Sequence, residues 1–217
     1  LMNARISDKS YKSYLRFRFF YKKIFKNIDK VFAQSEVDKQ RLQELGAKNV
    51  EVIGNIKLAQ LPSKKALFEK PNITTIVAAS THEGEEDHTL NSYKKEFGKL
   101  IIVPRHPERF LKVEELIKIY AKDKNISFHK FSNKEDFSSD IVLVDIMGIL
   151  NDIYEISDIT ILCGAFAKIG GHNPIEPAFF GNVIISGKNI FNQKSLFECI
   201  NNYYLIENSE LKEYLEK

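Results

Sequence analysis

The sequence contains little cysteine, little excess charge and no long apolar run, and each of these shortages excludes a class of protein. Its 217 residues include two cysteines, Cys163 and Cys199, which are too few for a disulfide framework and favour a reducing cytosol. A formal net charge of +3 gives no indication of nucleic-acid binding. No segment supplies the roughly 18–20 consecutive apolar residues that span a bilayer, and the first residues lack the zones of a signal peptide. We therefore expect a soluble globular chain with one large core or two smaller ones.

Short runs rich in β-branched residues alternate with longer segments of helical periodicity. The runs that we predict to be strands are 73–80, 99–103, 140–145, 159–164 and 182–186. Apolar residues recur on one face of the predicted helix at 107–122. Upstream, a further helix is expected between Ser35 as N-cap and Gly46 as terminator. This alternation predicts an α/β fold with a Rossmann-like, doubly wound parallel sheet.

The segment 57–71 interrupts this alternation. It holds two prolines and four lysines and has no regular apolar spacing, which is typical of a linker between two α/β parts.

Unusual polar stretches follow several predicted strands. Ligands of open α/β sheets bind outside the carboxyl ends of the strands, so these stretches are the places to look for a site. The stretches lie at 80–86, 104–109, 146–148 and 170–176.

The stretch after the strand at 159–164 has the composition of a helix start that binds an anion. Gly170 and Gly171 permit close approach of the backbone, and Pro174 suits a first helical turn because it needs no N–H partner. Asn173 can cap such a helix, whose free N–H groups favour phosphate or carboxylate. Glu176 would repel a phosphate, so we expect it to accept hydrogen bonds from the hydroxyl groups of a ribose. Together these residues indicate a nucleotide site.

Ordinary structural roles would also explain several of these residues. The glycine pair and Asn173 also fit a plain turn before a capped helix. Ser80 and Glu83 match the spacing of a capping box, and Arg105 could pair with Glu83 or Glu108 on the surface.

Three histidines, His82, His106 and His172, follow predicted strands and raise the question of a metal site. Their sequence spacing matches no familiar metal-binding motif, so we expect none.

Four motifs in order resemble a known family. They are STHEGEE at 80–86, VPRHPERF at 103–110, DIMGIL at 145–150 and GGHNPIEPA at 170–178. NARIS at 3–7, the segment 33–57 and the Phe191-Asn192 pair extend the likeness. These motifs resemble the donor-binding half of the 3-deoxy-D-manno-octulosonic acid (Kdo) transferases, which are lipid A glycosyltransferases. The resemblance implies a GT-B architecture of two Rossmann-like halves, with the donor CMP-Kdo bound to the C-terminal half.

The resemblance also assigns the residues that bind CMP-Kdo. The assigned positions are Pro104, Arg105, Met147, Gly148, Ile149, Asn173, Pro174, Ile175 and Glu176. Ser80, Thr81 and His172 are further candidates for contact with the phosphate or the Kdo carboxylate. Ile149 departs from the family, which usually has an acidic residue there, so we expect a contact through the backbone rather than through the side chain at this position. The resemblance implies inverting transfer without a metal or a cofactor.

The domain assignment and the remaining partners follow from the same resemblance. We expect residues 1–57 to be the tail of the N-terminal acceptor half, 58–72 to be the interdomain linker and 73–217 to be the donor domain. The family's general base and its lipid A precursor site are expected in the N-terminal half, outside this chain. Transfer by these residues alone is then not expected. The implied location is the cytoplasmic face of the bacterial inner membrane.

Two other functions remain open. Residues 11–30 mix aromatic and basic side chains, which favours an anionic membrane surface, although a helix packed on a sheet would share this composition. The chain would then be a membrane-surface module without chemistry. The second alternative is a GT-B transferase or epimerase that uses a UDP-sugar.

Overall fold

The chain forms two compact units. A computed structural model describes residues 1–56, 62–63 and 66–217. Internal contacts divide the chain into Leu1–Leu61 and Pro62–Lys217. Residues 57–61 and 64–65, which fall within the predicted linker, lie outside the described residues.

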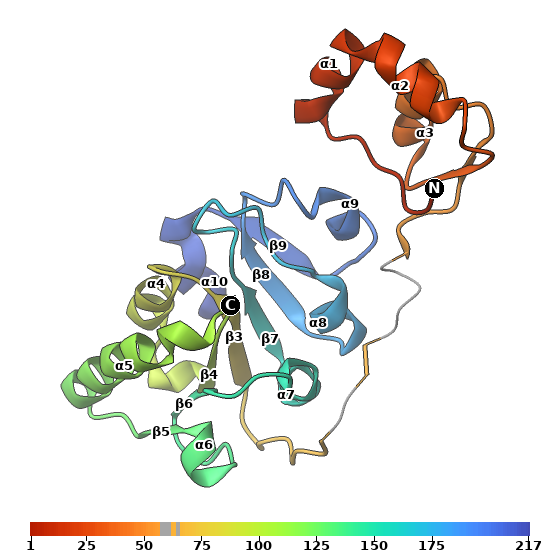
Figure 1. Ribbon diagram of the computed structural model, residues 1–217. Helices are drawn as coiled ribbons and strands as arrows, with labels where there is room; N and C mark the ends of the chain where they lie inside the picture. The colour runs from red at the N-terminus through yellow and green to blue at the C-terminus, as the bar shows by residue number, and fades with distance from the viewer. Residues whose placement is uncertain (57–61, 64–65) are drawn as a thin grey trace. The chain divides into compact units, whose positions relative to one another are not determined.

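The first unit is a small α/β arrangement (Figure 1). Its elements are α1 (Asp8–Arg16), α2 (Arg18–Phe25), β1 (Val31–Ala33), α3 (Glu36–Glu44) and β2 (Val50–Val52). The two strands pair in parallel around a core that includes Val31 and Leu42. Ser35 accepts a hydrogen bond from the Asp38 N–H at 3.1 Å, which confirms it as the N-cap of α3. Gly46 follows the helix with φ +104°, a conformation that favours glycine.

The second unit contains a seven-stranded parallel sheet, which confirms the predicted fold class. The strand order is β5-β6-β4-β3-β7-β8-β9. The strands are β3 (Thr75–Thr81), β4 (Lys99–Pro104), β5 (Phe128–Lys130), β6 (Ile141–Leu143), β7 (Ile159–Leu162), β8 (Val183–Gly187) and β9 (Tyr203–Ile206). Five of these match the predicted runs within a few residues. The two edge strands, β5 and β9, were not predicted.

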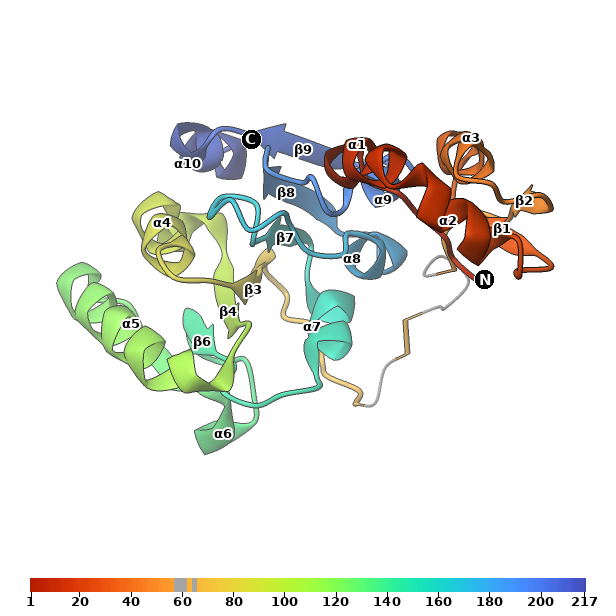
Figure 2. The same ribbon diagram turned by 45° about the horizontal axis from the view of Figure 1, so that its top comes forward.

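Helices cover both faces of this sheet (Figures 1 and 2). In β3, Ile76 and Ala78 pack into one apolar cluster, whereas Val77 and Ala79 pack into another on the opposite face. The first cluster contains residues of α4 (Glu85–Ser92), α5 (Phe110–Lys124) and α10 (Leu211–Leu215). The second contains residues of α6 (Phe131–Lys134), α7 (Leu150–Ile156), α8 (Ile175–Phe179) and α9 (Lys194–Phe197). Successive side chains of a buried strand point to opposite faces of the sheet, so both faces must be covered. The second unit therefore has three layers, with the sheet between two layers of helices.

Single-turn 3₁₀ helices complete the second unit. They are η2 (Lys95–Phe97), η3 (Pro107–Arg109) and η4 (Asn208–Glu210). The predicted helix at 107–122 therefore begins as η3 and continues as α5.

The last part of the predicted linker lies against the second unit. The ring of Phe68 packs edge-on against Phe131 and Phe137, with centroids 5.6 and 5.3 Å apart. Lys70 forms an ion pair with Asp158 at 2.6 Å.

Candidate functional site

The predicted site residues follow the carboxyl ends of four neighbouring strands. In the sheet order β6-β4-β3-β7, the loop after each strand carries one of the four motifs. The chain builds β3, β4 and β6 on one side and then crosses to β7 on the other side of β3. The topological switch point therefore lies between β3 and β7, where open α/β sheets bind their ligands.

Two histidines join the loops at this switch point. His82 follows β3 and His172 follows β7, and their Nε2 atoms lie 2.9 Å apart, with ring planes within 3° of parallel. The ring of His106, which follows β4, lies 5.6 Å from that of His82. The fold thus brings together three loops that are far apart in the sequence.

Two buried glutamates of α4 hold these loops in place. Glu85 accepts hydrogen bonds from the N–H groups of Gly164 at 2.8 Å, Ala167 at 3.1 Å and His82 at 3.0 Å. Burial raises the pKa of Glu85, and these N–H donors oppose that rise. Glu85 therefore fixes the loop after β7 to the start of α4.

Glu86 connects the loop after β3 to the loop after β4. It is fully buried, accepts a hydrogen bond from the Thr81 hydroxyl at 2.9 Å and pairs with Arg109 at 2.9 Å. Neither glutamate was predicted as part of the site, because the sequence of an acidic first helical turn gives no indication of burial. Thr81, which was a candidate for ligand contact, is fully buried, and its hydroxyl positions Glu86.

Arg105 is exposed at the end of β4. Its backbone N–H donates to the Thr81 carbonyl at 3.0 Å, which ties this loop to β3. The surface pairing considered from the sequence is not observed, because Glu83 pairs with Lys112 and Glu108 lies nearest His106. Among the described residues, no carboxylate forms an ion pair with Arg105. Its guanidinium is therefore available for an anionic ligand.

The electrostatics of this edge disfavour additional positive charge. Burial lowers the pKa of His172 to about 4, with further lowering by His82, Arg105 and His106. The pKa of His82 is also lowered, by burial first and then by His106, Arg105 and Arg109. Both imidazoles are consequently neutral at pH 7, in a positive local potential that favours anions.

The glycine pair after β7 shapes the loop as predicted. Gly170 has φ +111°, and a Cβ there would lie 2.2 Å from the Asn192 amide nitrogen. Asn192 donates its backbone N–H to the Gly170 carbonyl at 3.1 Å and its side-chain amide to the Ile169 carbonyl at 3.2 Å. Asn192, from the Phe191-Asn192 pair that extends the family resemblance, thus fixes this loop.

The helix start at Asn173 differs from the expected anion site. Asn173 accepts a hydrogen bond from the Ile175 N–H at 3.1 Å and donates to Glu176 at 3.0 Å, while Pro174 occupies the N-cap position. One free N–H is therefore already satisfied. Because α8 has only five residues, its dipole gives less stabilisation to an anion than the sequence implied.

The capping box that the sequence suggested at Ser80 and Glu83 does not form. Ser80 lies within β3 with φ +56°, at an irregularity in the pairing with β4, and is buried. Helix α4 begins after Gly84, and it is Glu85 that accepts the His82 N–H. The irregularity extends the strand past Ser80, so the helix begins later than expected.

The loop after β6 exposes Met147 and Gly148, whereas Ile149 is half-buried and packs against the second apolar cluster. Gly148 has φ +92°, which suits the turn into α7. The apolar Ile149 side chain thus packs against the core rather than projecting as a polar contact.

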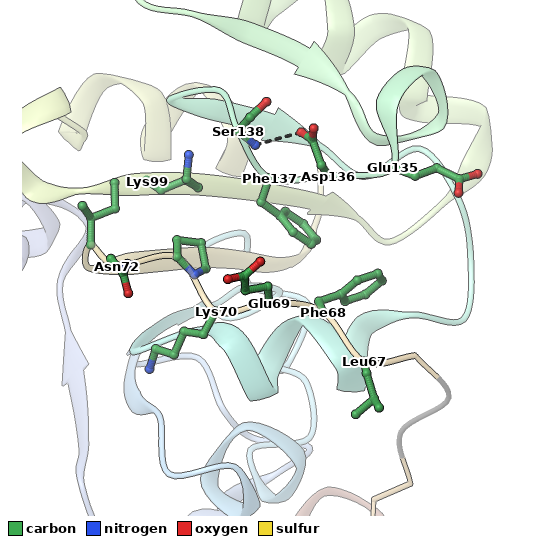
Figure 3. A pocket seen from close by; sticks show the side chains of 12 residues that line it. Leu67, Phe68, Glu69, Lys70, Asn72, Lys99, Glu135, Asp136, Phe137 and Ser138 are labelled. Carbon is green, nitrogen blue, oxygen red and sulfur yellow. Dashed lines mark hydrogen bonds between the residues drawn. The ribbon is translucent and has the colours of Figure 1, made fainter.

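A pocket of about 600 Å³ lies at the other end of the strands, where β3 and β4 begin (Figure 3). Its lining includes Lys99 at the start of β4, and Asp136, which accepts a hydrogen bond from the Ser138 N–H at 2.9 Å. Lys99 donates to the Ser139 carbonyl at 2.5 Å. None of the predicted site residues lines this pocket, and its polar side chains named here already have protein partners.

The described part of the chain offers neither a metal cluster nor a membrane span. No group of three or more His, Cys, Asp or Glu side chains among these residues is arranged to hold a metal ion. No helix among them is long and apolar enough to cross a membrane.

Comparison with known proteins identifies the family. The profile of the 3-deoxy-D-manno-octulosonic-acid transferase (kdotransferase) family matches residues 1–60. A bifunctional glycosyltransferase/methyltransferase of Fusobacterium nucleatum is 38% identical over 204 residues, covering 87% of this chain and 31% of its own length. A 3-deoxy-D-manno-octulosonic acid transferase of Rickettsia felis is 38% identical over 201 residues, covering 86% of this chain and 42% of its own length. The chain therefore spans less than half of either relative.

A solved structure supports the same relationship for the second unit's fold. The crystal structure of the C-terminal CMP-Kdo binding domain of WaaA from Acinetobacter baumannii aligns with a TM-score of 0.57 and 25% identity. The alignment covers 67% of this chain and 79% of that domain. The sheet topology, the switch-point site and these similarities agree, and the chain belongs to the 3-deoxy-D-manno-octulosonic acid transferase family, with the fold of a GT-B C-terminal domain.

Proposed function

We propose that the second unit binds CMP-Kdo as the donor for transfer of Kdo to a lipid A precursor in lipopolysaccharide biosynthesis. The observation that carries this proposal is the exposed Arg105 beside the switch point, in a loop that is hydrogen-bonded to the end of β3 and close enough to His172 to affect it electrostatically. A guanidinium there can hold the phosphate that leaves with CMP. In this proposal Pro104 shapes the Arg105 loop.

The remaining predicted residues complete the nucleotide site. We assign the loop Met147–Ile149 to backbone contacts with the nucleotide, because Ile149 packs inward. Residues Asn173–Glu176 form the third contact, with Glu176 directed to the ribose. Residues 1–57 are assigned to the acceptor half, 58–72 to the linker and 73–217 to the donor domain.

Titration calorimetry with CMP, UMP, UDP and AMP tests the proposed ligand class. We expect CMP to bind more tightly than UDP, and to bind equally well with magnesium or with EDTA, because Arg105 supplies the positive charge. An enzyme for UDP-sugars would instead favour UDP. A clear preference for UDP, or binding only with magnesium, would overturn the proposal.

We further propose that transfer inverts the anomeric configuration and needs no metal. A guanidinium can hold the leaving phosphate without a metal ion, and direct displacement of that phosphate by the acceptor hydroxyl inverts the anomeric carbon. Analysis of the product anomer by nuclear magnetic resonance tests this, since retention would contradict it.

The surface of α2 favours contact with an anionic membrane. Phe17, Phe19 and Phe20 are 51%, 70% and 53% exposed, so these three rings are not buried within their own unit. Exposed basic residues lie between and beside them, namely Arg16, Arg18, Lys22, Lys23 and Lys26. Aromatic and basic side chains together favour an anionic lipid surface. We propose that this surface brings the enzyme to its lipid acceptor on the cytoplasmic face of the inner membrane.

Vesicle sedimentation tests this proposal. Phe19→Ser with Phe20→Ser should reduce binding to vesicles containing anionic lipid several-fold, while Leu111→Ser with Ile119→Ser, at exposed positions of α5, should leave binding unchanged. Equal binding by both double variants would remove the α2 surface from consideration. A chain that binds vesicles but ignores CMP would support a module without chemistry.

A further inference from the structure

Three imidazoles from separate loops meet at the switch point. His82 and His172 are half-buried and share one hydrogen bond, and His106 is more exposed beside them. Burial of two neighbouring imidazoles in an electropositive loop cluster is unfavourable unless they stay neutral or face an anion.

The hydrogen bond limits how many protons can lie at the contact between the two rings. At an Nε2–Nε2 distance of 2.9 Å, one nitrogen must donate its proton and the other must accept. A second proton at this contact would place two N–H groups against each other. The neutral pair can therefore take up a proton at the accepting Nε2 only if the bond opens and one imidazole donates elsewhere, whereas the unprotonated Nδ1 of the donating imidazole can take one with the bond intact.

Cationic groups dominate the surroundings of the pair. The guanidinium groups of Arg105 and Arg109 face it from the loop after β4, beside the imidazole of His106. Lys168, in the loop after β7, is exposed to solvent.

The neighbouring carboxylates have other partners. Glu83 pairs with Lys112, Glu85 accepts from backbone N–H groups, and Glu86 pairs with Arg109. Glu176 accepts from Asn173. A ligand anion is thus the group that would balance the charge around the two imidazoles.

Building on the proposed function, we propose that His82 and His172 form the subsite for the carboxylate of the donor sugar and take up one proton from solvent as that carboxylate binds. The sugar is a 2-keto acid, so its carboxylate and the phosphate of CMP are attached to the same carbon. Two anions so close need two adjacent positive groups. Arg105 holds the phosphate, and the protonated histidine pair holds the carboxylate.

The proton balance is simple. Water or buffer supplies one proton to the accepting Nε2, which ends the N–H···N bond because both nitrogens then carry hydrogen. One N–H turns to the carboxylate and forms a charge-assisted hydrogen bond. No bond of the sugar is made or broken in this step.

Calorimetry in two buffers of different ionisation enthalpy measures the proton uptake. The full chain, saturated with CMP at pH 7, is titrated with 3-deoxy-D-manno-octulosonic acid or with its methyl ester. The free acid should bind with uptake of about half to one proton, because the imidazoles are neutral before it binds. The ester, which has no carboxylate, should bind more weakly and take up none.

Variants separate the pair from the rest of the unit. His172→Gln should abolish the uptake and weaken binding of the acid about tenfold, the loss expected for one charge-assisted hydrogen bond, while CMP affinity stays within about twofold. His82→Gln should do the same and serves if His172→Gln does not fold. His129→Gln is the matched control. His129 lies in the edge strand β5, away from the switch point between β3 and β7, so this variant should retain both uptake and affinity.

The possible outcomes distinguish this inference from the proposed function. Failure of CMP to bind would overturn both. CMP binding followed by acid binding without uptake, or uptake unchanged in His172→Gln and His82→Gln, would overturn the carboxylate subsite alone. The same uptake on binding of CMP by itself would assign the pair to the phosphate and would equally overturn it.

Discussion

Arg105 should contribute to binding through charge, since its guanidinium is exposed and no described carboxylate pairs with it. We expect Arg105→Ala to weaken CMP binding by about 1.5–3 kcal/mol, the range for a hydrogen bond to a charged group, and to affect cytidine little. Calorimetry with both ligands measures the difference.

The nearby Lys112→Ala is the control for Arg105. It also removes one positive charge, but from a surface pair with Glu83, so CMP affinity should change by less than about 0.5 kcal/mol. Equal losses of CMP and cytidine affinity in Arg105→Ala would indicate a disturbed fold instead of a lost phosphate contact.

Glu176 should determine the preference for ribose over deoxyribose. One of its oxygens accepts from Asn173 at 3.0 Å, and a carboxylate has capacity for further donors such as a ribose diol. Wild type should favour CMP over 2′-deoxy-CMP by about 1.5–3 kcal/mol, and Glu176→Ala should reduce this preference. Asn173→Ala removes the amide partner and should leave most of it. An undiminished preference in Glu176→Ala would exclude Glu176 from the site.

At the scale of single elements, the loop after β7 depends on a close approach at Gly170. A Cβ there would lie 2.2 Å from the Asn192 amide, in a backbone with φ +111°. We expect Gly170→Ala to lower the free energy of unfolding by about 2–4 kcal/mol, from strain and overpacking together. Denaturant unfolding measures this loss.

Gly181→Ala separates strain from overpacking. Gly181 has φ +81°, but nothing lies within 4 Å of the position that a Cβ would take, so only the backbone strain remains, about 1 kcal/mol. Similar losses for the two variants would mean that the loop near Asn192 yields easily to a methyl group.

The histidine pair should make stability depend on pH. The pKa of His172 falls from its usual 6.5 to about 4 on folding, so the unfolded chain binds more protons between these values. Its contribution is complete above pH 6.5 and is lost as the pH falls through 4. We expect His172→Gln to reduce the drop in Tm between pH 7 and pH 5 by about 2–4 °C, measured by thermal melting. An unchanged drop in His172→Gln would contradict this contribution.

For the whole molecule, the sequence predicts the doubly wound sheet because its five central strands are buried on both faces and read as continuous apolar runs. The edge strands escape prediction because Phe128–Lys130 and Tyr203–Ile206 are short and only partly buried, so their composition is mixed. Their pairing is decided by neighbours far away in the chain. The predicted order of polar stretches holds because parallel strands place their carboxyl ends at one edge.

The site is less predictable than the sheet. Arg105 and the glycine pair could be recognised from the sequence, because a charged residue directly after a strand and two adjacent glycines are local patterns. The structure shows Arg105 exposed after β4 and both glycines with positive φ. Glu85 and Glu86 do not, because their roles depend on burial against Gly164 and Arg109, which no local pattern reveals. The contact between His82 and His172 depends on the switch point itself, where residues 90 positions apart meet.

The last prediction concerns catalysis by these 217 residues. Transfer requires a base that deprotonates the acceptor hydroxyl, yet Glu85 and Glu86 at the switch point are committed to backbone N–H groups and to Arg109. We therefore expect the chain to bind CMP but to transfer no Kdo from CMP-Kdo to a lipid A precursor, as followed by mass spectrometry. Robust turnover would place the base among the residues of this chain.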